Sequence, residues 1–108
     1  MDLLARARCL MEQPVYYVSR RLATIYGPRA AFLAAIIMDE IIQQDHFKKL
    51  DDEGYALLFH NDLIEKSGMS LHQLQSAKKV LIGGRILFVK MKGLPAKQWY
   101  KLNPAKLI

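Results

Sequence analysis

The feature that most restricts the fold is a sharp turn between two short helical segments, near residue 68. Asn61 predicts the start of the first segment, because an asparagine side chain is a good N-cap. Gly68 predicts its end, since glycine adopts the left-handed conformation of a helix C-terminus at almost no cost. Ser70, with Gln73 three residues later, matches a capping box at the start of the second segment. The chain therefore contains a predicted helix-turn-helix.

The second of these helices has two unlike sides. Leu74, Ala77 and Leu81 share one stripe at helical spacing, which predicts a buried side. With about 3.6 residues per turn, the opposite side carries polar and basic residues, namely His72, Gln75, Ser76 and Lys79. A helix that lies in a DNA major groove needs this arrangement, with an apolar back and a front of donors, acceptors and positive charge.

A basic hairpin follows directly. Gly83-Gly84 predicts the end of the helix, and Ile86–Lys92 is rich in the β-branched and aromatic residues typical of a strand. A turn at 93–97 leads into a return strand at Gln98–Leu102. Residues 85–106 contain no carboxylate, and three lysines surround the hairpin tip: Lys90, Lys92 and Lys97. A helix-turn-helix followed by a basic hairpin is typical of a winged helix.

The rest of the chain fits the same order. We expect one winged-helix domain over residues 1–108, of the α+β class and mainly helical, with a small three-stranded antiparallel sheet. Its expected parts are a helical or extended N-terminal extension (1–27), a core helix and first strand (28–60), the helix-turn-helix (61–82), the wing hairpin (83–102) and a tail (103–108). In the first strand, Tyr55, Leu57 and Phe59 share one expected face.

The predicted core helix, from Arg29 to about Phe47, is apolar around much of its girth. One continuous stripe at helical spacing consists of Ala30, Leu33, Ala34, Ile37 and Ile41. A second apolar side runs through Phe32, Ile36 and Ile42. A helix of this kind is buried by more than one neighbour. The sequence leaves open whether the second side packs inside the domain or against a second copy of the chain.

The net charge of +6 is unevenly distributed. Residues 1–60 hold seven Lys or Arg and eight Asp or Glu, whereas residues 61–108 hold nine Lys or Arg and two acidic residues. The whole excess therefore falls in the predicted helix-turn-helix and wing. A one-sided basic surface is typical of a polyanion binder, and the plainer interpretation is a solvated face that keeps the protein soluble.

The sequence lacks the residues that several classes of function require. The chain shows no phosphate-binding glycine loop, no Ser/His/Asp or Cys/His arrangement and no metal-ligand spacing, so we expect no enzyme, metal or cofactor. The single Cys9 excludes an internal disulfide. The longest apolar run, Ala30–Met38, is nine residues, far short of a membrane span. No signal peptide is visible either, so a cytoplasmic protein without membrane association is expected.

Two stretches carry a family resemblance. They are the helix-turn-helix positions Leu63, Gly68-Met69-Ser70, Ala77 and Leu81, and the wing sequence KGLPAKQWYKLN from Lys92 to Asn103. Over 62–102 the chain resembles the N-terminal winged-helix domain of phage and plasmid replication proteins, of the replisome-organiser or initiator type; residues 1–59 match only in the order of their elements.

The resemblance implies binding of double-stranded DNA at a replication origin or an operator, and a C-terminal portion that loads partners. Further replication proteins, or a second copy in a homodimer, would use the helix that starts near Arg29. A transcriptional repressor of the same fold and a winged-helix adaptor that binds protein are the alternatives. The sequence does not distinguish replication from transcription, and it gives neither the target sequence nor the oligomeric state.

Ten residues form the predicted DNA-binding site: His72, Gln73, Gln75, Ser76, Lys78, Lys79, Arg85, Lys90, Lys92 and Lys97. In the recognition helix, about residues 71–82, Gln75 and Ser76 are expected to hydrogen-bond base edges, and His72 and Lys79 to reach guanine acceptors or phosphates. Lys78 is expected on the flank of that helix, against a phosphate.

Gln73 is either a base reader or a capping partner. The three wing lysines are expected to follow a neighbouring phosphate strand or to enter the minor groove. Neutralising about five phosphates would give a log–log salt slope near −4 to −5.

Overall fold

In the computed structural model of the protein, the described residues are 2–6 and 16–107. A helical turn forms at 3–6 in the expected N-terminal extension, and residues 7–15 of that extension lie outside the described residues. Five helices follow, α2 (Arg20–Tyr26), α3 (Pro28–His46), α4 (His60–Ser67), α5 (Leu71–Gly83) and α6 (Pro104–Leu107). Three strands, β1 (Ala56–Leu57), β2 (Leu87–Lys92) and β3 (Lys97–Leu102), make one antiparallel sheet in the order β1-β3-β2.

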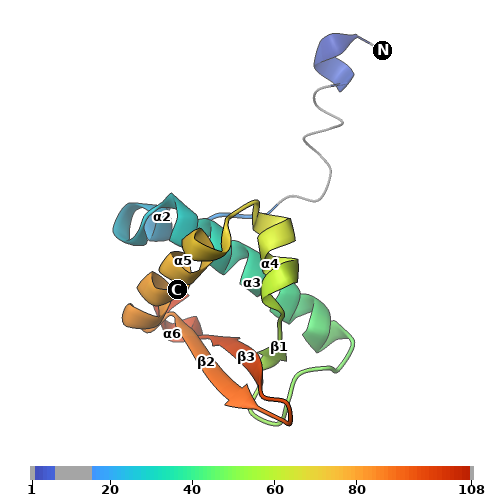
Figure 1. Ribbon diagram of the computed structural model, residues 1–108. Coiled ribbons are helices and arrows are strands. Elements are labelled where there is room, and N and C mark those ends of the chain that lie inside the picture. The colour runs from blue at the N-terminus through green and yellow to red at the C-terminus, as the bar shows by residue number, and fades with distance from the viewer. Residues whose placement is uncertain (1, 7–15, 108) are drawn as a thin grey trace.

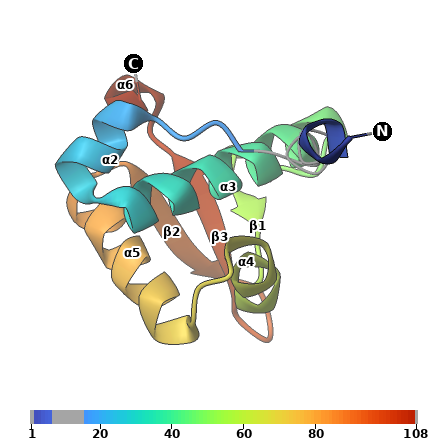
Figure 2. The same cartoon turned by 90° about the horizontal axis from the view of Figure 1, so that it is seen from above.

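The helices form a layer on one side of this sheet (Figure 1). Figure 2 shows α3 crossing the middle of the layer, with α2 and α5 near its N-terminal end and α4 nearer its C-terminal end. The element order and the sheet are those of a winged helix, so the predicted fold class is confirmed. The tail is not wholly extended, because it forms the short helix α6.

The core lies between the helical layer and the sheet. Its largest fully buried side chains are Leu33, Ile36, Ile37, Leu63, Leu74, Leu81, Ile86, Leu87 and Tyr100. Each of the aliphatic ones stabilises the fold by about 2 kcal/mol relative to an exposed position. The predicted inward stripe of α5, from Leu74 to Leu81, is confirmed, and it fixes which side of α5 faces outward.

The turn between α4 and α5 forms largely as its residues predict. Gly68 ends α4 with a left-handed φ of 71°. The Ser70 hydroxyl accepts a hydrogen bond from the Gln73 amide at 3.1 Å, and the Gln73 side chain accepts one from the Ser70 amide at 3.1 Å. The capping box is therefore confirmed. The prediction that Asn61 caps α4 is wrong. The helix begins at His60, the residue before Asn61, and Phe59 is at the N-cap position.

Replacing Ser70 by alanine should lower the free energy of unfolding by about 1 kcal/mol, because the Gln73 amide loses its acceptor. Urea denaturation measures the change. Ser76→Ala is the matched control, since Ser76 is exposed on the same helix and should change stability by less than about 0.5 kcal/mol. Equal effects of the two substitutions would show that the box does not stabilise α5.

The first strand, β1, is short. The sequence predicts one shared face for Tyr55, Leu57 and Phe59, and the structure shows that the buried residues of this segment are the alternate ones, Ala56 and Leu58. Ala56 lies opposite the fully buried tyrosine of β3, so alternation along the strand turns its neighbours to the outer face of the sheet.

Most of the second apolar side of α3 packs inside the domain. The ring of Phe32 meets the ring of Tyr16 edge-on, with 5.9 Å between centroids, and Ile36 is fully buried. Ile42, one turn before the end of α3, is 59% exposed. Within residues 2–6 and 16–107, no helix combines the length and the apolar character needed to cross a membrane.

Candidate nucleic-acid interface

The outward side of α5 is exposed, as predicted. His72, Gln75, Ser76 and Lys79 all project to solvent, and we call these four residues the α5 outer face. A shallow hollow runs along this side of α5 and is lined by His72, Gln75, Ser76, Lys78, Lys79 and Ile82. Donors, acceptors and a free ammonium group are thus presented together on a helix whose back is anchored in the core.

Lys78 departs from the prediction. The residue is only 8% exposed, so its expected position on an open flank of the helix is wrong. Its Nζ atom lies 2.6 Å from Gln98 Oε1, 2.8 Å from the Tyr100 hydroxyl and 3.0 Å from His60 Nε2. Lys78 follows Leu74 by four residues and therefore shares the inward side of α5.

These four residues, Lys78, His60, Gln98 and Tyr100, form a polar group that we call the Lys78 cluster. Burial lowers the pKa of Lys78. Burial and the neighbouring Lys78 charge lower the pKa of His60, against a smaller opposite effect of its hydrogen bond with Gln98. Burial raises the pKa of Tyr100 to about 12. All three shifts favour the neutral form of the group, and the cluster contains no carboxylate to offset the ammonium of Lys78.

The lowered pKa of His60 should make the protein less stable in mild acid. As the pH falls through about 6.5, the unfolded chain takes up a proton at His60 that the folded chain still excludes, so the free energy of unfolding falls. Urea denaturation between about pH 7.5 and 5.5 measures this dependence. His60→Gln should reduce the dependence, whereas His72→Gln, at an exposed histidine, should keep it. An unchanged dependence in His60→Gln would contradict this reading.

Lys90 and Lys92 do not lie on the side of α5. Val89 packs against the core, so alternation along β2 turns Lys90 and Lys92 to the outer face of the sheet. Their ammonium groups meet a carboxylate there, with Asp51 Oδ2 lying 2.6 Å from Lys90 Nζ and 3.1 Å from Lys92 Nζ. Glu53 lies 3.3 Å from Lys90 on the same face.

Asp51 is held firmly in this position. Its side chain is only 6% exposed, and its Oδ1 atom accepts hydrogen bonds from the amides of Glu53 and Tyr55 at 2.9 and 2.8 Å. Burial alone would raise the pKa of Asp51, but the hydrogen bonds from Lys90, the two amides and Lys92 hold that pKa well below its usual range. The charge of the two lysines is therefore largely offset within the folded chain.

Lys97 lies opposite Lys92 in the hairpin register, so its backbone position belongs to the outer face of the sheet. Its side chain nevertheless reaches Phe59 at the start of α4, with Nζ 5.8 Å from the centre of the ring. It lines a second hollow together with Leu58, Phe59, His60, Met91, Ala96 and Gln98. His60 and Gln98 belong to the Lys78 cluster, and Lys78 lines the hollow of α5. The cluster therefore joins the two hollows, and the α5 outer face and Lys97 lie at either side of it.

Two further predicted residues lie apart from this surface. The side chain of Gln73 is occupied in the capping box, which answers the question that the sequence left open. Arg85 is exposed just after α5, with a φ of 59°, and lines neither hollow. His60 and Gln98 were missed as parts of the site, although the alternation of β3 places Gln98 on the same face as Tyr100.

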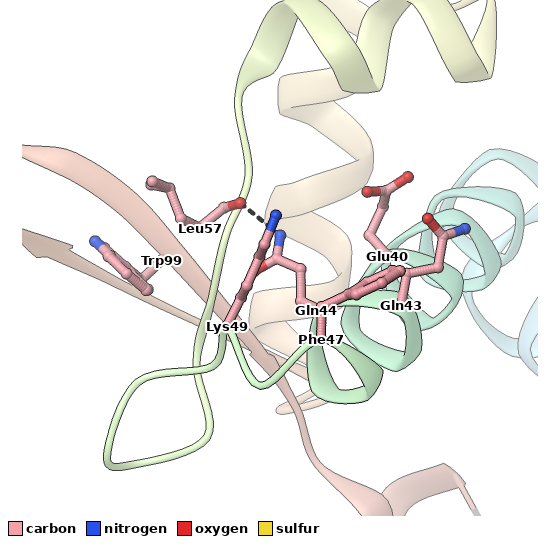
Figure 3. Close-up of a pocket in the computed structure, with 7 residues that line it drawn as sticks. All are labelled: Glu40, Gln43, Gln44, Phe47, Lys49, Leu57 and Trp99. Atoms are coloured by element: carbon pink, nitrogen blue, oxygen red, sulfur yellow. Dashed lines mark hydrogen bonds between the residues drawn. The ribbon is translucent and has the colours of Figure 1, made fainter.

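A third hollow, of about 430 Å³, lies at the C-terminal end of α3 and contains none of the predicted site residues (Figure 3). It is lined by Glu40, Gln43, Gln44, Phe47, Lys49, Leu57 and Trp99. The Gln44 side chain donates a hydrogen bond to the Leu57 carbonyl at 2.8 Å and so fixes α3 to β1. Phe47 is 68% exposed. Across the described part of the chain, no group of three or more His, Cys, Asp or Glu residues could hold a metal ion.

No protein-family model matches the chain, and no curated protein matches it in sequence. One similar solved structure is the N-terminal domain of a DNA binding protein, with a TM-score of 0.70 and 16% identity, over 95% of this chain and 81% of that one. Another is the structure of a Rep–DNA complex, with a TM-score of 0.68 and 16% identity, over 95% and 82% of the two chains. The chain shares their fold. The fold that the family resemblance implied is thereby confirmed.

Proposed function

We propose that the protein binds double-stranded DNA, with α5 in the major groove. The observation that carries this proposal is the α5 outer face, which presents Gln75, Ser76, His72 and Lys79 to solvent from a helix anchored by its buried back. Gln75 and Ser76 have the donors and acceptors to read base edges, and Lys79 and His72 can meet guanine acceptors or phosphates. The similar Rep–DNA complex supports the same function.

The wing contributes through Lys97 in this proposal. The side chain of Lys97 lines the hollow beside the Lys78 cluster, whereas those of Lys90 and Lys92 are paired with Asp51. Fewer phosphates are then neutralised than the sequence suggested. Contacts to about three or four phosphates give a log–log salt slope near −3.

The proposed setting is the initiation of phage or plasmid replication in the cytoplasm, by binding and without catalysis. The wing sequence from Lys92 to Asn103 and the likeness to a Rep–DNA complex support this setting. A repressor of the same fold is the alternative. Footprinting on the replicon that encodes the protein separates the two, because an initiator should protect repeated sites at the origin and a repressor a site that overlaps a promoter.

A fluorescence anisotropy titration with a labelled 30-base-pair duplex tests DNA binding itself. We expect saturable binding at low salt and an affinity that falls steeply between about 50 and 200 mM salt. An adaptor that binds only protein would show no binding, or a salt slope near zero.

We also propose that protein contacts, with a second copy or with other replication proteins, form at the C-terminal end of α3. The exposed side chains of Ile42 and Phe47 support this location, beside the hollow of Figure 3. Phe47→Ser should leave binding to a short duplex unchanged and weaken self-association in sedimentation experiments. Loss of DNA binding in Phe47→Ser would contradict the proposal, because the DNA would then contact the C-terminal end of α3 rather than the α5 outer face.

A further inference from the structure

The Lys78 cluster brings together α4, α5 and β3, which contribute His60, Lys78 and the pair Gln98 and Tyr100. We propose that Lys78 is a positioning residue, which fixes the start of β3, and with it the wing, at a set place beside the α5 outer face. The helix and the wing then meet one duplex as a single rigid surface. This inference rests on the proposed DNA binding and adds to it the device that sets the geometry of the site.

The hydrogen bonds of the cluster match what a lysine ammonium supplies. An ammonium group has three donors and no acceptor, and Lys78 Nζ has three neutral partners, Gln98 Oε1, the Tyr100 hydroxyl and His60 Nε2. The Tyr100 hydroxyl in turn donates to Gln98 Oε1 at 2.6 Å. One nitrogen atom therefore fixes groups from two other elements at once, which an uncharged side chain of similar length cannot do.

Stability does not explain the charge. Among the residues that the structure describes, no carboxylate lies within ion-pair distance of Lys78. Burial of a charge that has no ion-pair partner costs free energy, and even complete buried ion pairs can often be replaced by apolar side chains of similar volume without loss of stability. Without the ammonium, the Tyr100 hydroxyl and His60 Nε2 both lie within reach of Gln98 Oε1, at 2.6 and 3.1 Å. No buried polar group would then be left without a partner.

The location of the cluster supplies a reason for the charge. Lys78 lines the hollow of the α5 outer face, and its partners line the hollow that holds Lys97. A duplex across both hollows would place its negative potential over the ammonium, and this potential favours the charged form. DNA binding would therefore strengthen the cluster, and the cluster would hold the wing in register with α5.

This coupling has a pH signature. Burial lowers the pKa of Lys78, so Lys78 loses its charge at a pH below the ordinary lysine pKa. The other titratable groups that face it stay neutral over the same range, since the pKa of His60 is lowered and that of Tyr100 is raised to about 12. The neighbouring charge on α5 itself is Lys79. The affinity for DNA should therefore fall through Lys78 as the pH rises from neutral toward the ordinary lysine pKa of about 10.4.

The test compares Lys78→Met with Lys79→Met, which removes the same charge one residue away on the exposed side. With a random-sequence 30-base-pair duplex, Lys78→Met should keep or raise the melting temperature, weaken binding about fivefold or more, and lose most of the pH dependence. Lys79→Met should weaken binding and keep the pH dependence. The inference is overturned if Lys78→Met shows the parent pH profile, or if it melts earlier while its folded form binds as tightly as the parent.

A second measurement needs no DNA. Spin labels at Ile82→Cys and Leu94→Cys, in a Cys9→Ser background, report the distance from α5 to the wing tip by pulsed electron resonance. Ile82 and Leu94 are exposed, at 44% and 102%. The distance distribution should broaden in Lys78→Met and not in Lys79→Met, and equal widths would overturn the inference. If the parent protein does not bind DNA, the proposed function fails while this measurement still decides the role of Lys78.

Discussion

Replacing Lys79 and Lys97 together by alanine should weaken DNA binding about 100-fold near 100 mM salt, because each loses a charge-assisted contact to phosphate. The salt slope should become less negative by about 1.8, the share of two phosphate contacts. Both lysines are exposed and lie at the two sides of the Lys78 cluster. Anisotropy titrations at several salt concentrations measure the affinity and the slope.

The matched control removes the same charge from the two wing lysines that are paired with Asp51. Lys90→Ala with Lys92→Ala should weaken binding by less than about threefold, since Asp51 and Glu53 together already offset these two lysines in the folded chain. Two equal losses would show that nonspecific charge, rather than a defined surface, holds the DNA. A larger loss in the Lys90 and Lys92 variant would move the interface to the outer face of the sheet.

The largest effect on stability is expected from Leu74→Ala, which should lower the free energy of unfolding by about 3 kcal/mol. Leu74 is fully buried and belongs to the stripe that anchors α5. Leu71→Ala is the control, because it removes the same atoms from the same helix at a position that is 47% exposed. Urea denaturation should show a loss at Leu71 of less than about 1 kcal/mol.

The same pair of variants tests whether α5 is held by its buried back. Leu74→Ala should also weaken DNA binding at temperatures where the variant begins to unfold, and should bind normally where it remains folded. Equal free energies of unfolding for the Leu74→Ala and Leu71→Ala proteins would mean that the inward stripe of α5 does not stabilise the fold more than its exposed side does.

Local signals in the sequence predicted the elements well. The capping box of Ser70 and Gln73 and the left-handed Gly68 involve residues within a few positions of one another, so their geometry follows from the residues themselves. The stripe at helical spacing in α5 likewise identified its buried side. These features were enough to predict the helix-turn-helix without any knowledge of the rest of the chain. They also predicted that four side chains of α5 are exposed, namely His72, Gln75, Ser76 and Lys79.

The environment of the charged residues could not be predicted in this way. The acidic and basic halves are separate in sequence, but the fold places Asp51 against Lys90 and Lys92, about 40 positions later. Alternation in β2 shows that Lys90 and Lys92 share a face, but only the packing of the sheet decides that this face is the outer one. The environment of Lys78 could not be predicted for the same reason, because its hydrogen-bond partners Gln98 and Tyr100 come from β3.

In the proposed complex, the duplex contacts the α5 outer face, the Lys78 cluster and Lys97. These contacts can be mapped by the backbone amide shifts in nuclear magnetic resonance spectra during titration with a 30-base-pair duplex. We expect the largest shifts at residues 72–79 and 97–98, and small shifts at residues 51–53, 90 and 92. Shifts concentrated on the outer face of the sheet, with those of α5 unchanged, would contradict the account.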